Sequence, residues 1–221
     1  MRRSAIGSPS RAVACGFAVL MLAGPGSFGV AEVRGQEVVS ASLAAAPPTT
    51  VAPFSLIDQR GEAVTDEDFR GRFMLVFFGY TYCPDVCPLG LQRMSGALDA
   101  LGAEAEQVAP IFITLDPERD SSSVLAAYTA HFHPRLMALT GTREQVDAAK
   151  RSYGARSFKV YLPPSFEEGE SDEDDNSRYL MQHSASTYLV GPDGAIERIF
   201  SHETSSREMA RQIRGRVTGG L

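Results

Sequence analysis

The sequence feature that most constrains the fold is an unbroken apolar run that leads directly into two cysteines and a helical segment. Residues 73–78 read Phe-Met-Leu-Val-Phe-Phe, which is typical of a strand buried on both faces of a sheet. Cys83 and Cys87 follow, and apolar residues then recur at helical spacing up to Gly102. This order predicts an α/β fold with both cysteines at a strand-to-helix junction.

The rest of the chain continues this alternation of strands and helices. Strands are expected at residues 54–58, 108–115, 136–139, 158–162, 187–190 and 195–200. Further helices are expected at residues 121–131, 142–154 and 204–217. A hairpin turn at Gly191–Gly194 makes part of the sheet antiparallel. The pattern therefore predicts one α/β domain over residues 53–221, with a central mixed sheet flanked by helices.

Composition and charge exclude one broad class of function. The 221 residues are 43% hydrophobic and 22% charged, which is ordinary for a soluble domain. The formal net charge is −6, and no basic cluster follows residue 31. Nucleic-acid binding needs clustered Lys and Arg to neutralise phosphates, so we expect no nucleic-acid partner. Residues 163–177 are strongly acidic and are expected to form a solvated loop.

Residues 1–31 are expected to direct export. Basic residues at the start precede an uncharged, mostly apolar run over residues 12–23, and small residues follow at signal-peptidase spacing. The alternative is a retained anchor in the inner membrane, because residues 12–31 are uncharged over about 20 positions, the length that crosses a bilayer. Both place the domain in the periplasm or another extracytoplasmic space. Residues 32–52 are predicted to be a flexible linker.

The placement of Cys83 and Cys87 favours reactive sulfur chemistry. A helix N-terminus stabilises a thiolate, and two cysteines four positions apart can share one side of a helical turn. The pair can therefore form a soft dithiolate metal site or a redox disulfide. An inert structural disulfide is the alternative. A bridge over so short a loop adds little stability, however, because loop closure supplies most of a disulfide's effect.

A third ligand would decide between the metal sites open to this pair. Two thiolates suit Cu(I), Zn(II) or an iron–sulfur cluster. Structural zinc and iron–sulfur sites usually need four ligands, and the exported domain has no further cysteine. The candidate third ligands are His131, His133, His183 and His202. The residues alone favour roles other than metal binding. They place His131 and His133 at a helix C-terminus, where histidine interacts favourably with the helix dipole, and His183 and His202 at the surface.

Three segments of the sequence resemble the Sco/SenC family. Residues 78–88 read Phe-Gly-Tyr-Thr-Tyr-Cys-Pro-Asp-Val-Cys-Pro, similar to the family's cysteine motif. Residues 114–120 contain an Asp-Pro-Glu-Arg-Asp block, and residues 179–194 are similar to the family's histidine segment. The resemblance runs from about Pro53 to Ser201, with the three blocks in the family's order.

This resemblance implies a thioredoxin-like fold in which Cys83, Cys87 and His183 bind copper, as Cu(I) or Cu(II). The implied function is a copper chaperone that helps to mature the copper centre of cytochrome c oxidase. Its implied partner is the oxidase subunit that carries that centre or another copper chaperone. Gln182 stands where family members usually have Asp. Ser186 replaces a proline that keeps metals away from the cysteines of ordinary thioredoxin-like oxidoreductases.

A thiol–disulfide oxidoreductase is the alternative function. In that hypothesis Cys83 attacks a disulfide of a copper-site partner, and Cys87 resolves the mixed disulfide. The cysteine spacing differs from that of thioredoxins, and the two activities can coexist in one protein. Asp116 and Asp120 follow a predicted strand near the site. We expect them to form a turn and cap the next helix; the alternative is an electrostatic effect on the site.

Overall fold

The computed structural model describes residues 50–161 and 179–219. The predicted export segment (residues 1–31), most of the predicted linker (residues 32–52) and the acidic segment (residues 163–177) lie outside the described residues. Within the described ranges, no helix has the length and apolar character needed to cross a membrane.

The described part of the chain makes backbone contacts from its first residue onward. Thr50 forms a β-bridge with Ala195. The Val51 amide donates a hydrogen bond of 3.0 Å to the carbonyl oxygen of Gly194, and the Val51 side chain is buried. The last residues of the expected linker therefore contact the folded domain.

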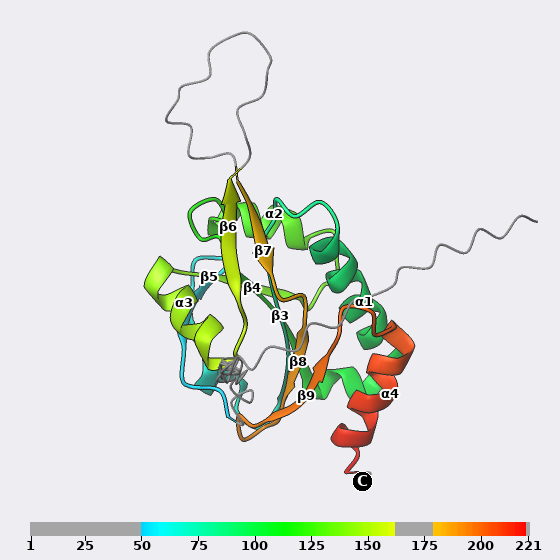
Figure 1. Ribbon diagram of the computed structural model, residues 1–221. Helices are drawn as coiled ribbons and strands as arrows, with labels where there is room; N and C mark the ends of the chain where they lie inside the picture. Colours follow the sequence, from blue (N-terminus) through cyan, green and yellow to red (C-terminus); the bar gives the residue numbers. More distant parts are fainter. Residues whose placement is uncertain (1–49, 162–178, 220–221) are drawn as a thin grey trace, which may run out of the picture. The chain divides into compact units, whose positions relative to one another are not determined.

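The central sheet has seven strands in the order β2-β1-β5-β4-β3-β8-β9 (Figure 1). Its strands are β1 (Ser55–Asp58), β2 (Ala63–Thr65), β3 (Phe73–Gly79), β4 (Val108–Thr114), β5 (Met137–Thr140), β8 (Thr187–Val190) and β9 (Ile196–Phe200). Strands β3, β4 and β5 run parallel, whereas β8 pairs antiparallel with β3 and β1 pairs antiparallel with β5. The mixed sheet confirms the predicted fold class.

Helices cover both faces of this sheet. They are α1 (Val86–Leu101), α2 (Ser122–Thr129), α3 (Arg143–Ser152) and α4 (Ser206–Val217), with short 3₁₀ helices η1 (Asp66–Phe69) and η2 (Gly102–Gln107). Neighbouring residues of β3 point to opposite faces. Phe77 stacks on Phe112 and lies under Gly90 of α1, whereas Phe78 packs against Tyr153 at the end of α3. The side chains of β3 thus form the centre of the core.

Local sequence signals explain the helix bounds. Ser121 caps α2, and Thr142 with Gln145 forms a capping box at the start of α3. Helix α1 ends at Gly102, whose φ of 63° is accessible to glycine at low cost. These signals fix where each helix starts or stops, and therefore where the connecting loops can carry functional groups.

A separate antiparallel hairpin lies beside the main sheet (Figure 1). It consists of β6 (Ser157–Tyr161) and β7 (Tyr179–His183), paired so that Ser157 faces His183. The first of these strands is expected from the sequence, whereas the second is not: His183, for which the residues alone favoured a place on the surface, is the last residue of β7. Alternation along β7 buries Tyr179 and Met181 and exposes Leu180. The hairpin therefore packs one face against the rest of the domain.

Candidate metal centre

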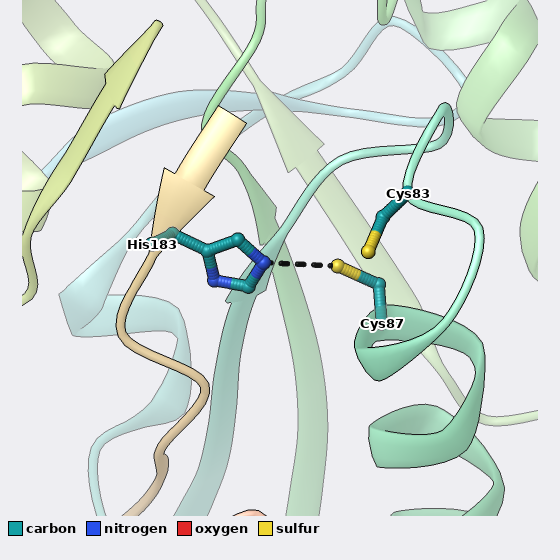
Figure 2. A group of neighbouring side chains, drawn as sticks. All are labelled: Cys83, Cys87 and His183. Atoms are coloured by element: carbon teal, nitrogen blue, oxygen red, sulfur yellow. Dashed lines mark hydrogen bonds between the residues drawn. The ribbon is translucent and has the colours of Figure 1, made fainter. Parts of the chain in front are cut away.

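Cys83, Cys87 and His183 lie together beyond the C-terminal end of β3 (Figure 2). Cys87 projects from the first turn of α1, Cys83 from the loop before it, and His183 approaches from the end of β7. The three potential ligand atoms all lie within 4.8 Å of one another. Neither cysteine forms a disulfide and both are buried, and the histidine is half-buried. The structure thus brings together the three residues that the sequence resemblance indicated.

Gly79 explains how the Cys87 sulfur can approach the end of β3. A Cβ atom at this position would lie 2.7 Å from the sulfur of Cys87 and 2.8 Å from the Phe112 ring. Contacts this short do not occur between real Cβ atoms and their neighbours. The glycine therefore lets the first turn of α1 pack closely on the sheet, with Cys87 fully buried.

Asp120 holds the loop that leads to Cys83. Its carboxylate accepts hydrogen bonds from the Thr81 amide (3.1 Å), the Thr81 hydroxyl (2.5 Å) and the Thr114 hydroxyl (2.6 Å). Asp120 is fully buried, and this burial raises its pKa above the ordinary value. It does not cap α2, because Ser121 does. Asp120 instead ties the cysteine loop to the end of β4.

Asp116 begins the expected turn, because its carbonyl oxygen accepts hydrogen bonds from the amides of Arg119 (3.1 Å) and Asp120 (2.9 Å), but its side chain does not cap α2. It is fully buried, and its carboxylate accepts hydrogen bonds from the Tyr179 hydroxyl (2.6 Å) and from Nε of Arg119 (2.5 Å). Tyr179 is the first residue of β7. Asp116 therefore connects the end of β4 to the strand that carries His183. Sequence reasoning missed this contact, although the Asp-Pro-Glu-Arg-Asp block contains both charged partners.

The backbone beside His183 selects the form of its imidazole. Nδ1 lies 3.1 Å from the carbonyl oxygen of Ser184, which can only accept a hydrogen bond. Nδ1 therefore carries the proton, and the lone pair of Nε2 points toward the sulfur of Cys87, 3.3 Å away. Phe77 and Tyr80 contact the ring edge-on, with centroid distances of 6.4 and 5.9 Å. The imidazole is thus oriented to offer Nε2 to a metal.

The two sulfurs differ in how readily they lose a proton. A hydrogen bond from Cys87 outweighs the effect of burial and lowers the pKa of Cys83 to about 3. The hydrogen bond to Cys83, together with burial, raises the pKa of Cys87 above its ordinary value. The metal-free pair therefore holds one thiolate and one thiol. A cation bound to both sulfurs would release the remaining proton.

The chemistry of the donor set fits copper. Two thiolates and one neutral imidazole are soft donors that suit Cu(I), whereas structural zinc normally requires a fourth ligand. Among the described residues, no other group of three His, Cys, Asp or Glu side chains is arranged to hold a metal. His133 lies past the end of α2, and its Nδ1 accepts a hydrogen bond from the Arg135 amide, so it neither joins this site nor caps that helix.

Comparison with known proteins identifies relatives over most of the chain. The SCO1/SenC family model matches residues 43–218. The human mitochondrial protein SCO1 homolog is 39% identical over 168 residues, which cover 75% of this chain and 52% of the human protein. The SCO2-like protein of Rickettsia felis is 35% identical over 162 residues, which cover 73% of this chain and 74% of that protein. The chain thus spans about half the length of its human relative.

Solved structures show the same fold. Copper-bound ScoI of Bradyrhizobium japonicum superimposes with a TM-score of 0.64 at 35% identity, covering 78% of this chain and 99% of that one. Copper-bound yeast Sco1 gives a TM-score of 0.65 at 31% identity, covering 79% and 91%. These neighbours confirm the thioredoxin-like architecture expected from the sequence. The family model and the relatives agree, and the chain belongs to the SCO1/SenC family.

Proposed function

We propose that this protein is a copper chaperone that holds copper between Cys83, Cys87 and His183 and delivers it to the copper centre of cytochrome c oxidase. The observation that carries the proposal is the convergence of two sulfurs and one imidazole nitrogen within 4.8 Å. Family members with this fold have been solved with copper bound, which supports copper as the cargo. The recipient is the oxidase subunit that carries the copper site, or another copper chaperone.

The site suits a cargo that must be released. Three protein ligands leave Cu(I) able to accept a further donor from a recipient, so copper can pass by stepwise exchange of ligands. Cys83 is the more exposed of the two cysteines, and His183 is half-buried. We therefore expect an incoming donor to approach on the side of Cys83 and His183, while the fully buried Cys87 keeps its hold longest.

The location that fits this function is extracytoplasmic. The basic start and apolar run of residues 1–31 support export to the periplasm or an equivalent space. Retention of residues 12–31 as an inner-membrane anchor would keep the domain close to a membrane-bound oxidase. The related human and mouse proteins are named as mitochondrial, which is consistent with a role at a respiratory membrane.

Copper titration of the reduced protein tests the proposal. We expect the wild type to bind one Cu(I) per chain, and Cys83→Ser and Cys87→Ser to lose tight binding because each removes a thiolate. His183→Ala should lower the affinity roughly 10- to 100-fold or more, because even the loss of a residue that only orients a metal ligand has an effect of that size. Competition with a Cu(I) chelator under anaerobic conditions measures each value.

His202→Ala is the matched control, because His202 lies exposed in a turn after β9. It should bind copper like the wild type. Unchanged affinity in either cysteine variant would contradict the proposal. Rapid reduction of insulin disulfides by the copper-free protein would favour the oxidoreductase alternative, for which the low pKa of Cys83 is also suited.

A further inference from the structure

The metal centre has a cysteine half and a histidine half, and in the described part of the chain no ladder of backbone hydrogen bonds joins the strands that carry them. Cys83 and Cys87 follow β3 of the central sheet, whereas His183 ends β7, which pairs with β6 alone among the described strands. The cysteine and the histidine that contact each other are 96 residues apart in the chain. Side-chain contacts must therefore set the distance between the imidazole and the two sulfurs.

Arg119 makes contacts of this kind with both halves. On the histidine side, one terminal NH of its guanidinium donates a 3.1 Å hydrogen bond to the carbonyl oxygen of Tyr179, and its carbon lies 3.7 Å from the centre of the Tyr179 ring. On the cysteine side, the guanidinium lies 4.7 Å from the ring of Tyr82, the residue before Cys83. Arg119 thus lies between the strand of one ligand and the loop of the other two.

Asp116 fixes the guanidinium in this position. One of its carboxylate oxygens accepts from Nε of Arg119, and the other accepts from the hydroxyl of Tyr179. Asp116 is fully buried, and the Arg119 side chain is only 17% exposed. The pair is therefore largely shielded from water, where charge-assisted hydrogen bonds are stronger and more directional than at the surface.

We propose that Arg119 is a positioning residue that holds β7 against the cysteine loop and so keeps Nε2 of His183 within reach of the metal. The inference rests on the proposed function because the second of its tests measures the position of the imidazole through the binding of copper. Arg119 does not touch the ligand atoms; it acts through Tyr179, four residues before His183 on the same strand. Without it, Cys83 and Cys87 still bind Cu(I), but the imidazole no longer does.

The chemistry of the site requires arginine at this position. A planar guanidinium can stack on tyrosine rings while its edge donates hydrogen bonds in fixed directions. An ammonium group carries the same charge but cannot do both at once. Nearby ion pairs of Glu118 with Arg143 and Lys159 span the same junction, but Glu118 is half exposed, so these pairs are weaker.

The first test needs no copper. In the reduced, metal-free wild type, proton NMR should show contacts between the rings of His183 and Tyr80, whose centroids are 5.9 Å apart. In Arg119→Gln we expect these contacts to be lost while the far-ultraviolet circular dichroism stays that of a folded domain. Arg135→Gln is the matched control: Arg135 also donates to backbone carbonyls, those of Ala105 and Val108, but at the opposite end of β4.

The second test is a double-mutant cycle on Cu(I) affinity. Arg119→Gln should lower the affinity about 10- to 100-fold and remove the nitrogen neighbour from the copper X-ray absorption spectrum, with the stoichiometry unchanged. Adding His183→Ala to Arg119→Gln should cost nothing further, because both changes remove the same ligand. If Arg119→Gln proves too unstable to study, Arg119→Lys should show the same loss of the nitrogen neighbour.

The outcomes separate this inference from the proposed function. Retention of the ring contacts and of the nitrogen neighbour in a folded Arg119 variant would overturn the positioning role. So would additive losses in the double mutant, since Arg119 would then act through the cysteines. Wild-type copper affinity in His183→Ala alone would instead remove histidine from the proposed site, and the metal-free ring contacts would still decide what Arg119 does.

Discussion

The cysteine half and the histidine half of the metal centre are built in different ways. Cys87 lies in the first turn of a helix that packs on a buried strand of the sheet, so closely that only glycine fits at position 79. His183 ends a two-stranded hairpin that is linked to the domain by the buried side chains of Tyr179 and Met181, by Arg119 and Asp116, and by a few ion pairs. The cysteines thus share the stability of the core, whereas the histidine depends on a small set of side chains.

This difference separates two properties that a copper carrier needs. Secure binding comes from the thiolates, one of which lies in a helix packed on the core and the other in a loop that Asp120 ties to β4. Release requires that one ligand can move at a lower free-energy cost, and parts of a protein with few buried contacts are the ones that open locally. The histidine hairpin is such a part, so we expect it to open more often than the central sheet.

The largest expected effect comes from the same substitution made in each half. Phe77 in β3 is 1% exposed, whereas Phe158 on the outer face of β6 is 61% exposed. Phe77→Ala should lower the free energy of unfolding by about 3–5 kcal/mol because it leaves a cavity in the core. Phe158→Ala should change it by less than about 0.5 kcal/mol. Urea unfolding measures the free energy of unfolding of both variants. Equal losses would contradict the difference between the core and the hairpin.

A smaller effect is expected from filling the space beside Cys87. Gly79→Ala should cost about 1–3 kcal/mol, because the added methyl group overlaps the Cys87 sulfur and the Phe112 ring. In a Cys87→Ala background the same change should cost less, since the sulfur is gone. Thermal unfolding of the wild type, the two single variants and the double variant gives the coupling energy between positions 79 and 87. An equal cost in both backgrounds would show that the sulfur does not limit the packing here.

The smallest expected effect concerns the ion pairs of Glu118 beside the hairpin, and it depends on pH. Ion pairs with Lys159 and Arg143 lower the pKa of Glu118 from its ordinary 4.5 to about 2. The folded state therefore prefers the ionised carboxylate of Glu118. The contribution of this group to the free energy of unfolding is complete above about pH 4.5 and is lost as the pH falls toward 2. Glu118→Gln should cost less than about 1 kcal/mol at pH 6 and almost nothing near pH 2.5.

Hydrogen exchange of the backbone amides of β7 measures the effect of Glu118→Gln on the hairpin directly. Glu118→Gln should speed exchange in the hairpin at pH 6, because it removes the partner of Lys159 on β6. Glu208→Gln is the matched control: its pKa is also lowered to about 2, by Arg211 and Gln212, but it lies in α4. Equal acceleration of hairpin exchange by both changes would mean that Glu118 has no specific role at this junction.

The sequence predicted the cysteine half better than the histidine half for a physical reason. The apolar run before Cys83, the helical spacing after Cys87 and the caps of α2 and α3 are local signals, and local signals can be read from neighbouring residues. The contact between Cys87 and His183 spans 96 residues, and only the resemblance to a known family indicated it. No property of a lone histidine distinguishes a ligand from a surface residue.

The missed strand β7 and the buried Asp116 have the same explanation. β7 is five residues long, and only its pairing with β6 and its burial against the domain make it a strand. Asp116 follows β4 in a segment rich in turn-forming residues, so a capping role was the natural expectation. Its actual partners, Arg119 and Tyr179, are brought to it by the fold.

The pairing of the hairpin also determines where the chain can tolerate change. Tyr161 faces Tyr179 at one end of the ladder, and Ser157 faces His183 at the other. The connection between β6 and β7 therefore attaches about 13 Å from the ligand, at ~3.3 Å per residue. A change confined to the Tyr161 end of β6 therefore lies four ladder positions from the pair that contains the ligand, and it alters the hairpin without touching His183.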